Sequence, residues 1–218
     1  MKKTIQDNEV DFVVWKDANV SRVVAFGDQT DAVSDKGVAI AFGQERVAAV
    51  NSPVGCAVTF GGGEANAHTA VSMLTSGGKA CSSRIAVALN HQGTAIGREI
   101  AFADNLDSQA HSEQLAISTG ARGQADGLVS IALGIEGTAV ARAGGSIAIA
   151  FYDQHPGRWE TAHGADSYWV DGEFFLRELR VAKVGEQGIR PDYVYRLDKE
   201  GVFVEVGPAE ESMASSSR

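Results

Sequence analysis

The chain has 218 residues, of which 44% are hydrophobic and 22% are charged, and its formal net charge is −9. This length suits a single domain with a small appendage, and the ordinary apolar fraction argues against wholesale disorder. No apolar run approaches the roughly 18 residues of a membrane span, and residues 6–9 are polar where a signal peptide needs an apolar stretch. We therefore expect no membrane association. Two cysteines are too few for a disulfide framework, so we expect a reducing compartment.

Residues 1–22 form the first zone, with charges of both signs and an apolar segment at residues 10–15. The residues that follow are repeats, and a stack of repeats needs a cap at each end. We therefore expect residues 1–22 to be an N-terminal cap.

Residues 23–150 are sparsely charged and rich in alanine and glycine, and they repeat one short sequence motif, which we call the phrase. The phrase alternates small and large residues, which is a strand signal, and glycine turns separate its copies. Successive copies are about 16 residues apart, so each repeat holds two short strands and two turns. The pattern predicts an all-β fold, a β-solenoid of the β-roll type; an ordinary β-sandwich is the alternative. The copies lie at residues 38–42, 56–60, 69–73, 85–89, 100–103, 115–119, 129–133 and 147–151.

One face of each phrase carries large apolar residues, and we expect this face to fill a narrow core. Ile131 and Ile149 then point inward, and an aspartate at either position would not be tolerated. Eight large residues at similar phase are expected to form one internal stack: Phe26, Phe42, Phe60, Met73, Leu89, Phe102, Leu133 and Phe151.

The other face carries Ala, Ser and Thr, and we expect it to point outward. A flat, weakly polar strand surface is typical of an interface, so we expect a homo-oligomer, a trimer or a dimer. Two alternatives stay open: the small residues point inward in a flattened core, or they form an ice-binding array, which the scattered threonines disfavour. The expected interface residues are Ala39, Ala41, Ala57, Thr59, Ala70, Ser72, Ala86, Ala88, Ala116, Ser118, Ser130, Ala132, Ala148 and Ala150.

Residues 151–207 are richer in charge and aromatic side chains, and residues 208–218 are expected to be a flexible tail. We expect strands at 167–170, 173–184, 194–197 and 202–206, forming a small antiparallel β-module that closes the solenoid. Polar and aromatic side chains gather in its first part, and a glycan or another ligand is the chemistry that they suit. The candidate ligand cluster is His155, Trp159, His163 and Trp169.

The segments IRPDYVYRL at 189–197 and GVFVEV at 201–206 resemble the ending of a family of uncharacterised phage and prophage proteins. In that family G-x-x-S-x-A repeats precede a K-P-D-x-W-Y-x-L-x-x-G-x-F-V-E-V pattern. Here Arg190 stands in place of the usual Lys, and YVY at 193–195 in place of Thr-Trp-Tyr. The repeats are also similar in shape to the β-roll head of trimeric bacterial adhesins. The resemblance implies a phage or prophage origin and brings no catalytic residues.

We find no catalytic constellation in the sequence. The triplet at residues 111–113 matches the first half of a zinc deaminase signature, but no Pro-Cys-x-x-Cys follows. Glu99, Asp104, Asp107 and Glu113 form an acidic stretch that is typical of a solvated loop. We therefore expect no enzymatic activity, no metal and no cofactor.

The expected function is that of a non-enzymatic phage-encoded binding or assembly protein, in the host cytoplasm or associated with the virion. A host or virion protein is the second expected partner. The alternatives are an anti-defence inhibitor, acting on a host protein or sequestering a small ligand, and a glycan-binding or glycan-processing virion protein. We expect no nucleic acid partner, and the sparse charge of the repeats cannot mimic a duplex that carries one charge per ~1.7 Å.

Overall fold

The computed structural model describes residues 13–16, 21–26, 31–35, 37–43, 47–50, 54–61, 63–155, 158–161, 167–170 and 173–209. Every regular element within these ranges is a β-strand. In chain order they are β1 (Val13–Lys16), β2 (Ser21–Phe26), β3 (Ala32–Ser34), β4 (Val38–Phe42), β5 (Val47–Val50), β6 (Cys56–Phe60), β7 (Glu64–Ser76), β8 (Lys79–His91), β9 (Thr94–Gly97), β10 (Ile100–Ala103), β11 (Gln109–Ser112), β12 (Leu115–Ser118), β13 (Gln124–Asp126), β14 (Val129–Ala132), β15 (Thr138–Ala141), β16 (Ser146–His155), β17 (Arg158–Thr161), β18 (Ser167–Val170), β19 (Glu173–Lys183), β20 (Tyr193–Leu197) and β21 (Phe203–Pro208). Among the described residues, no helix has the length and apolarity needed to cross a membrane.

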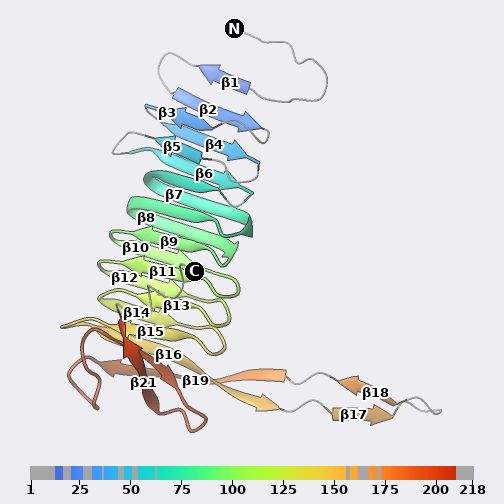
Figure 1. Cartoon of the computed structure of the whole chain (residues 1–218), viewed down its shortest axis with the longest axis vertical. Coiled ribbons are helices and arrows are strands. Elements are labelled where there is room, and N and C mark those ends of the chain that lie inside the picture. The colour runs from blue at the N-terminus through green and yellow to red at the C-terminus, as the bar shows by residue number, and fades with distance from the viewer. Residues whose placement is uncertain are drawn as a thin grey trace.

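The strands wind into a β-solenoid of about seven turns with about 15 residues per turn (Figure 1). The first stack consists of β2, β4, β6, residues 69–73 of β7, residues 85–89 of β8, β10, β12, β14 and β16. The second stack consists of β3, β5, residues 64–67 of β7, residues 79–82 of β8, β9, β11, β13 and β15. Neighbours within each stack are parallel, because each strand pairs with its equivalent in the next coil. The predicted all-β solenoid is confirmed.

The interior of the solenoid is built from the small residues of both stacks. In the first stack the following have no exposed surface: Ala39, Ala41, Ala57, Thr59, Ala70, Ser72, Ala86, Ala88, Ala101, Ala103, Ala116, Ser118, Ser130 and Ala132. The second stack contributes Ala48, Ala65, Ala80, Ala95, Ala110, Ala125 and Ala139, which are equally buried. The expectation that the Ala/Ser face points outward is therefore wrong for these residues, and the flattened-core alternative describes the molecule.

The size of the coil explains this inversion. About 15 residues, shared between two strands and two turns, leave a gap between the stacks that is too narrow for large side chains. The turns leave equally little room: a Cβ added to Gly97 would lie 2.0 Å from the carbonyl oxygen of Ile100, and one on Gly78 would lie 2.3 Å from the hydroxyl oxygen of Ser72. Large side chains must turn outward, although the hydrophobic effect alone would favour placing them in the core.

The large residues of the first stack form columns along its outer surface. The rings of Phe26, Phe42 and Phe60 are stacked, with centroids 4.7 and 4.5 Å apart. The strand register continues this column to Met73 and Leu89. The expected internal stack is therefore wrong in its location, because the column exists but lies outside.

The other residues that were expected in the internal stack do not belong to the Phe26 column. Phe102 and Ile131 belong to an adjacent outer column, which corrects the expectation that they point inward. Phe151, by contrast, is 7% exposed.

The last coil departs from the pattern of the others. β16 is shifted so that Ile147 and Ile149 point inward, opposite the small residues of β14, with 0% and 1% exposure. Ala148 and Ala150 lie on the outer side of β16, as expected, but neighbouring residues leave them only 7% and 6% exposed.

The C-terminal strands close one end of the solenoid. β19 pairs antiparallel with β16, β20 pairs antiparallel with β15, and β21 pairs with β20. The core is wider here and holds Ile147, Ile189 and Tyr195 among the alanines. β1 pairs antiparallel with β2 at the opposite end. These strands satisfy backbone groups that a terminal coil would leave open. Residues 1–12 and 17–20 of the expected cap, and residues 210–218 of the expected tail, lie outside the described residues.

Opposite charges meet on successive coils. The pairs are one coil apart and have N–O distances between 2.7 and 3.9 Å: Arg84–Glu99, Arg98–Glu113, Arg122–Asp107 and Lys79–Glu64. The hydroxyl of Thr119 likewise donates to the Asp104 carboxylate over 2.6 Å. The acidic stretch expected to be solvated is therefore part of a ladder that links neighbouring coils.

Candidate functional site

The outer surface of the first stack, from β4 to β14, is the largest candidate site, and we call it the apolar face. Its seven strands contain no Lys, Arg, Asp or Glu in their paired segments. Most of these residues are half-buried, because neighbouring side chains of the face cover one another. Leu89 and Val129 are the most exposed, with exposed fractions of 37% and 39%. The apolar face consists of Val38, Ile40, Phe42, Cys56, Val58, Phe60, Thr69, Val71, Met73, Ile85, Val87, Leu89, Ile100, Phe102, Leu115, Ile117, Val129 and Ile131.

The outer surface of the second stack is mixed, since one column is polar and the next includes Val33 and Ile96, which are 54% and 40% exposed. One of its columns reads Glu64, Lys79, Thr94, Gln109, Gln124 and Thr138. Such a polar column is typical of a strand surface in water. The uncharged apolar surface of the first stack is therefore the more continuous of the two, and the better suited to a contact.

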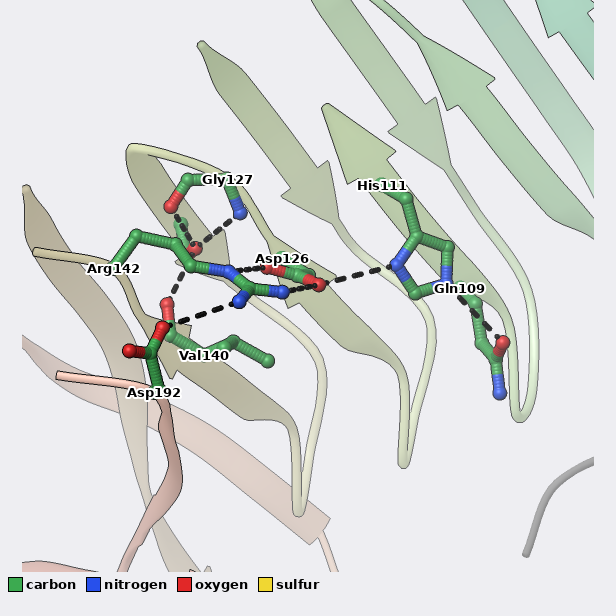
Figure 2. A network of polar contacts seen from close by, with 8 residues as sticks. Gln109, His111, Asp126, Gly127, Val140, Arg142 and Asp192 are labelled. Carbon is green, nitrogen blue, oxygen red and sulfur yellow. Dashed lines mark hydrogen bonds and ion pairs between the residues drawn. The ribbon is translucent and has the colours of Figure 1, made fainter. Parts of the chain in front are cut away.

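A hollow of about 630 Å³ is the second candidate site, and Asp126 of β13 is one of the residues that line it. The Asp126 carboxylate is 6% exposed and accepts hydrogen bonds from Arg142, over 2.7 Å from Nε and 2.6 Å from Nη2 (Figure 2). His111 Nδ1 lies 3.5 Å from the same carboxylate, and His111 Nε2 lies 3.3 Å from Gln109 Oε1. Arg142 Nη1 also donates to Asp192 over 3.2 Å.

The electrostatics of this network favour the charged forms. Burial by itself raises the pKa of the Asp126 carboxyl, but hydrogen bonds from His111 and Arg142, and their charges, lower it below its usual value. The hydrogen bond to Asp126 raises the pKa of Arg142 despite partial burial. Asp126 and Arg142 are therefore held as an ion pair.

The network joins the C-terminal module to the solenoid. Arg142 follows β15, whereas Asp192 precedes β20, and the Asp192 amide also donates to the carbonyl of Ala141 over 2.6 Å. Arg98, the second arginine that lines the hollow, is paired with Glu113 over 3.1 Å. With both arginines engaged, the arrangement is suited to fastening two parts of the chain.

The two cysteines are free thiols on opposite outer surfaces. Cys56 lies on the apolar face and is half-buried. Cys81 lies on the second stack, with its sulfur 4.0 Å from Glu64 Oε1. Burial raises the pKa of both thiols, and for Cys81 this outweighs the opposing charge of Lys79.

The expected ligand cluster of His155, Trp159, His163 and Trp169 is described only in part. Trp159 and Trp169 lie opposite each other in the β17–β18 pair, and His155 ends β16. Their side chains, and His163 as a whole, lie outside the described residues.

Sequence reasoning missed Asp126 and Arg142. A usable signal was present, because opposite charges placed one repeat apart come together on neighbouring coils.

Among the described residues, no group of three His, Cys, Asp or Glu could hold a metal ion. Comparison with protein-family models, with curated proteins and with solved structures gives no match to this chain.

Proposed function

We propose that this chain is a non-enzymatic assembly protein that forms a homo-oligomer, a dimer or a trimer, through the apolar face. The observation that carries the proposal is the unbroken apolar surface of the first stack: seven successive strands present apolar residues there without a single charge, whereas the second stack has a polar column beside a mixed one. A monomer would leave a long sheet surface of Val, Ile, Leu and Phe wet, without the charges that normally protect such a surface.

The size of the apolar face suits a stable interface. Its seven strands are mostly four or five residues long, so the stack measures roughly 34 Å by 16 Å at standard strand spacing. This flat area is about 540 Å², to which the uneven surface of the side chains adds, compared with the ~800 Å² that each partner of a standard interface buries.

A second copy of the chain is the occupant that fits. The columns repeat at the strand spacing of ~4.8 Å, and only a partner with the same repeat can interdigitate along the whole stack. A second copy of this chain has the same repeat, because its strands are stacked in the same way. The contact then buries residues such as Val87 and Ile117, which a solvent-facing strand would not select.

Light scattering tests the proposal with a matched pair of variants. The wild type is expected to be a dimer or trimer, and Val87→Lys with Ile117→Lys is expected to be a monomer with an unchanged circular dichroism spectrum. Thr94→Lys with Gln109→Lys, on the opposite outer surface, is expected to assemble like the wild type. A monomeric wild type, or equal dissociation of both variants, would refute the proposal.

The two cysteines provide a readout that needs no substitution. In the assembled protein, alkylation of Cys56 is expected to be at least tenfold slower than in the dissociated protein, because the second copy covers the apolar face and Cys56 with it. Cys81 is the internal reference and is expected to react at the same rate in both states. Equal rates for Cys56 in both states would contradict the interface.

The phage or prophage origin, and binding to a host or virion protein, remain predictions that rest on the resemblance of residues 189–206. Pull-down from infected cells, read by mass spectrometry, tests them. Recovery of neither a host nor a virion protein would count against a second partner.

A further inference from the structure

The distal part of the β16–β19 hairpin leaves the solenoid as a two-stranded ribbon (Figure 1). β14 pairs with β16 only as far as Ile149, whereas β16 continues to pair with β19 as far as His155. From residue 152 onward, these two strands have only each other as neighbours among the described strands. We call residues 152–155 and 173–176 the arm.

The arm presents large apolar side chains on both of its sides. Phe174 is 44% exposed, Phe175 is 50% exposed and Leu176 is 60% exposed. Successive residues of a strand point to opposite sides, so Phe174 and Leu176 lie on one side and Phe175 on the other. The side of Phe174 and Leu176 also holds Tyr152 and Gln154 and is uncharged, whereas the side of Phe175 also holds Asp153 and Glu173.

A ribbon of this kind needs a surface to lie on. Two paired strands alone are marginally stable in water, because they bury too little apolar area to offset the ordering of the chain. The solenoid of the same chain leaves Phe174 and Leu176 about half exposed, so it does not supply that surface.

We propose that the arm of each chain lies against a second copy, so that neighbouring copies exchange arms. This inference rests on the proposed homo-oligomer. The apolar face continues toward the arm: Leu179 and Val181 of β19 are 46% and 59% exposed and pair with Ala150 and Ala148 on the outer side of β16. A copy seated on the apolar face is therefore adjacent to the base of the arm.

Symmetry favours a copy over an unrelated partner. In a closed oligomer every chain carries one arm and one surface that receives an arm, so all arms are covered at the same time. The receiving surface is expected at the same end of the solenoid as the arm. β21 lies there (Figure 1), and exposed valines occur along it: Val202 just before the strand, and Val204 and Val206 within it, exposed by 57%, 36% and 55%.

Photo-crosslinking of the full-length protein tests the arm exchange. Phe174 is replaced by p-benzoylphenylalanine, a photoreactive analogue that keeps the aromatic ring, and the assembled protein is irradiated. A covalent dimer is expected, and mass spectrometry of mixed light and heavy-isotope chains is expected to map the crosslink between chains, near Val204. The control carries the analogue at Tyr195, which is 3% exposed in the core of the module, and is expected to give no interchain product.

A second variant measures what the arm contributes. Phe174→Ser with Leu176→Ser is expected to weaken the dissociation constant of the oligomer at least tenfold while the spectrum of the solenoid stays unchanged. If the crosslinks are all within one chain and the dissociation constant is unchanged, the arm exchange is overturned. Slow alkylation of Cys56 in the same protein would still support the interface at the apolar face. A monomeric wild type with fast alkylation of Cys56 would instead overturn the homo-oligomer itself.

Discussion

Ala116 and Ile117 are neighbours in β12 and lie on opposite sides of the first stack. Ala116 has no exposed surface and faces the narrow core, whereas Ile117 lies on the apolar face between Phe102 and Ile131 of the adjacent coils. The smaller residue is inside and the larger one outside, in the reverse of the usual order. The packing of the core and the proposed interface therefore use alternate residues of the same strands.

This relationship predicts opposite effects for two neighbouring substitutions. Ala116→Leu forces a larger side chain into a closely packed gap and is expected to lower the free energy of unfolding by about 1–3 kcal/mol or more. Ile117→Thr removes apolar surface only from the outer side and is expected to change the unfolding of the monomeric form by much less. Denaturant unfolding followed by circular dichroism measures both, and a greater loss for Ile117→Thr would show that the two faces are reversed.

Gly120 is expected to be the least replaceable of the turn glycines. A Cβ at this position would lie 1.6 Å from the carbonyl oxygen of Asn105, which belongs to the backbone of the preceding coil. Gly120→Ala must therefore push two coils apart and is expected to cost about 1–3 kcal/mol or more. Gly207→Ala is the control, because nothing lies within 4 Å of the added Cβ. Thermal unfolding of the two variants compares them, and equal midpoints would contradict the close approach.

Asp126→Asn is expected to destabilise the junction between the solenoid and its C-terminal module. It leaves Arg142 without its main partner, and the expected loss is about 1–3 kcal/mol, less than for a fully buried pair because Arg142 is partly exposed. Asp107→Asn, which removes a more exposed pair with Arg122, is expected to cost at most about 1 kcal/mol. Similar losses in denaturant unfolding would argue against a special role for Asp126.

The lowered pKa of Asp126 also predicts how stability depends on pH. A carboxyl whose pKa is lower in the folded than in the unfolded chain contributes stability above its unfolded pKa of about 3.9. That contribution is lost as the pH falls through the folded pKa. The wild type is therefore expected to lose stability more steeply than Asp126→Asn below about pH 4. Parallel pH profiles of the unfolding free energy would refute this.

The charge ladder is expected to contribute little at each step. Arg84 and Glu99 are 2.7 Å apart with both side chains at least 40% exposed, and such pairs are worth about 0.2–1 kcal/mol. Arg84→Glu places two acids on adjacent coils and is expected to destabilise modestly, and the exchange Arg84→Glu with Glu99→Arg is expected to restore most of the loss. A double-mutant cycle at low and high salt measures the coupling, which salt should weaken.

The repeats could be located from the sequence because the signals are local. Strict alternation predicts strands, glycines predict turns, and the regular return of the phrase predicts coils that pair with their neighbours. The same regularity would have located the charge ladder, since partners such as Arg84 and Glu99 are one repeat apart. Asp126 and Arg142 follow the same logic, but their third partner, Asp192, comes from the C-terminal module, and no repeat relates it to them.

Alternation divides a strand such as β12 into two faces, and the sequence by itself determined that division, the spacing of the coils and the solenoid class. Which face lies inside was decided only by the tertiary structure. Hydrophobicity alone would place Ile117 in the core and Ala116 outside. Closing a coil of about 15 residues brings the two stacks so near each other that only small side chains fit between them, so packing volume overrides side-chain hydrophobicity.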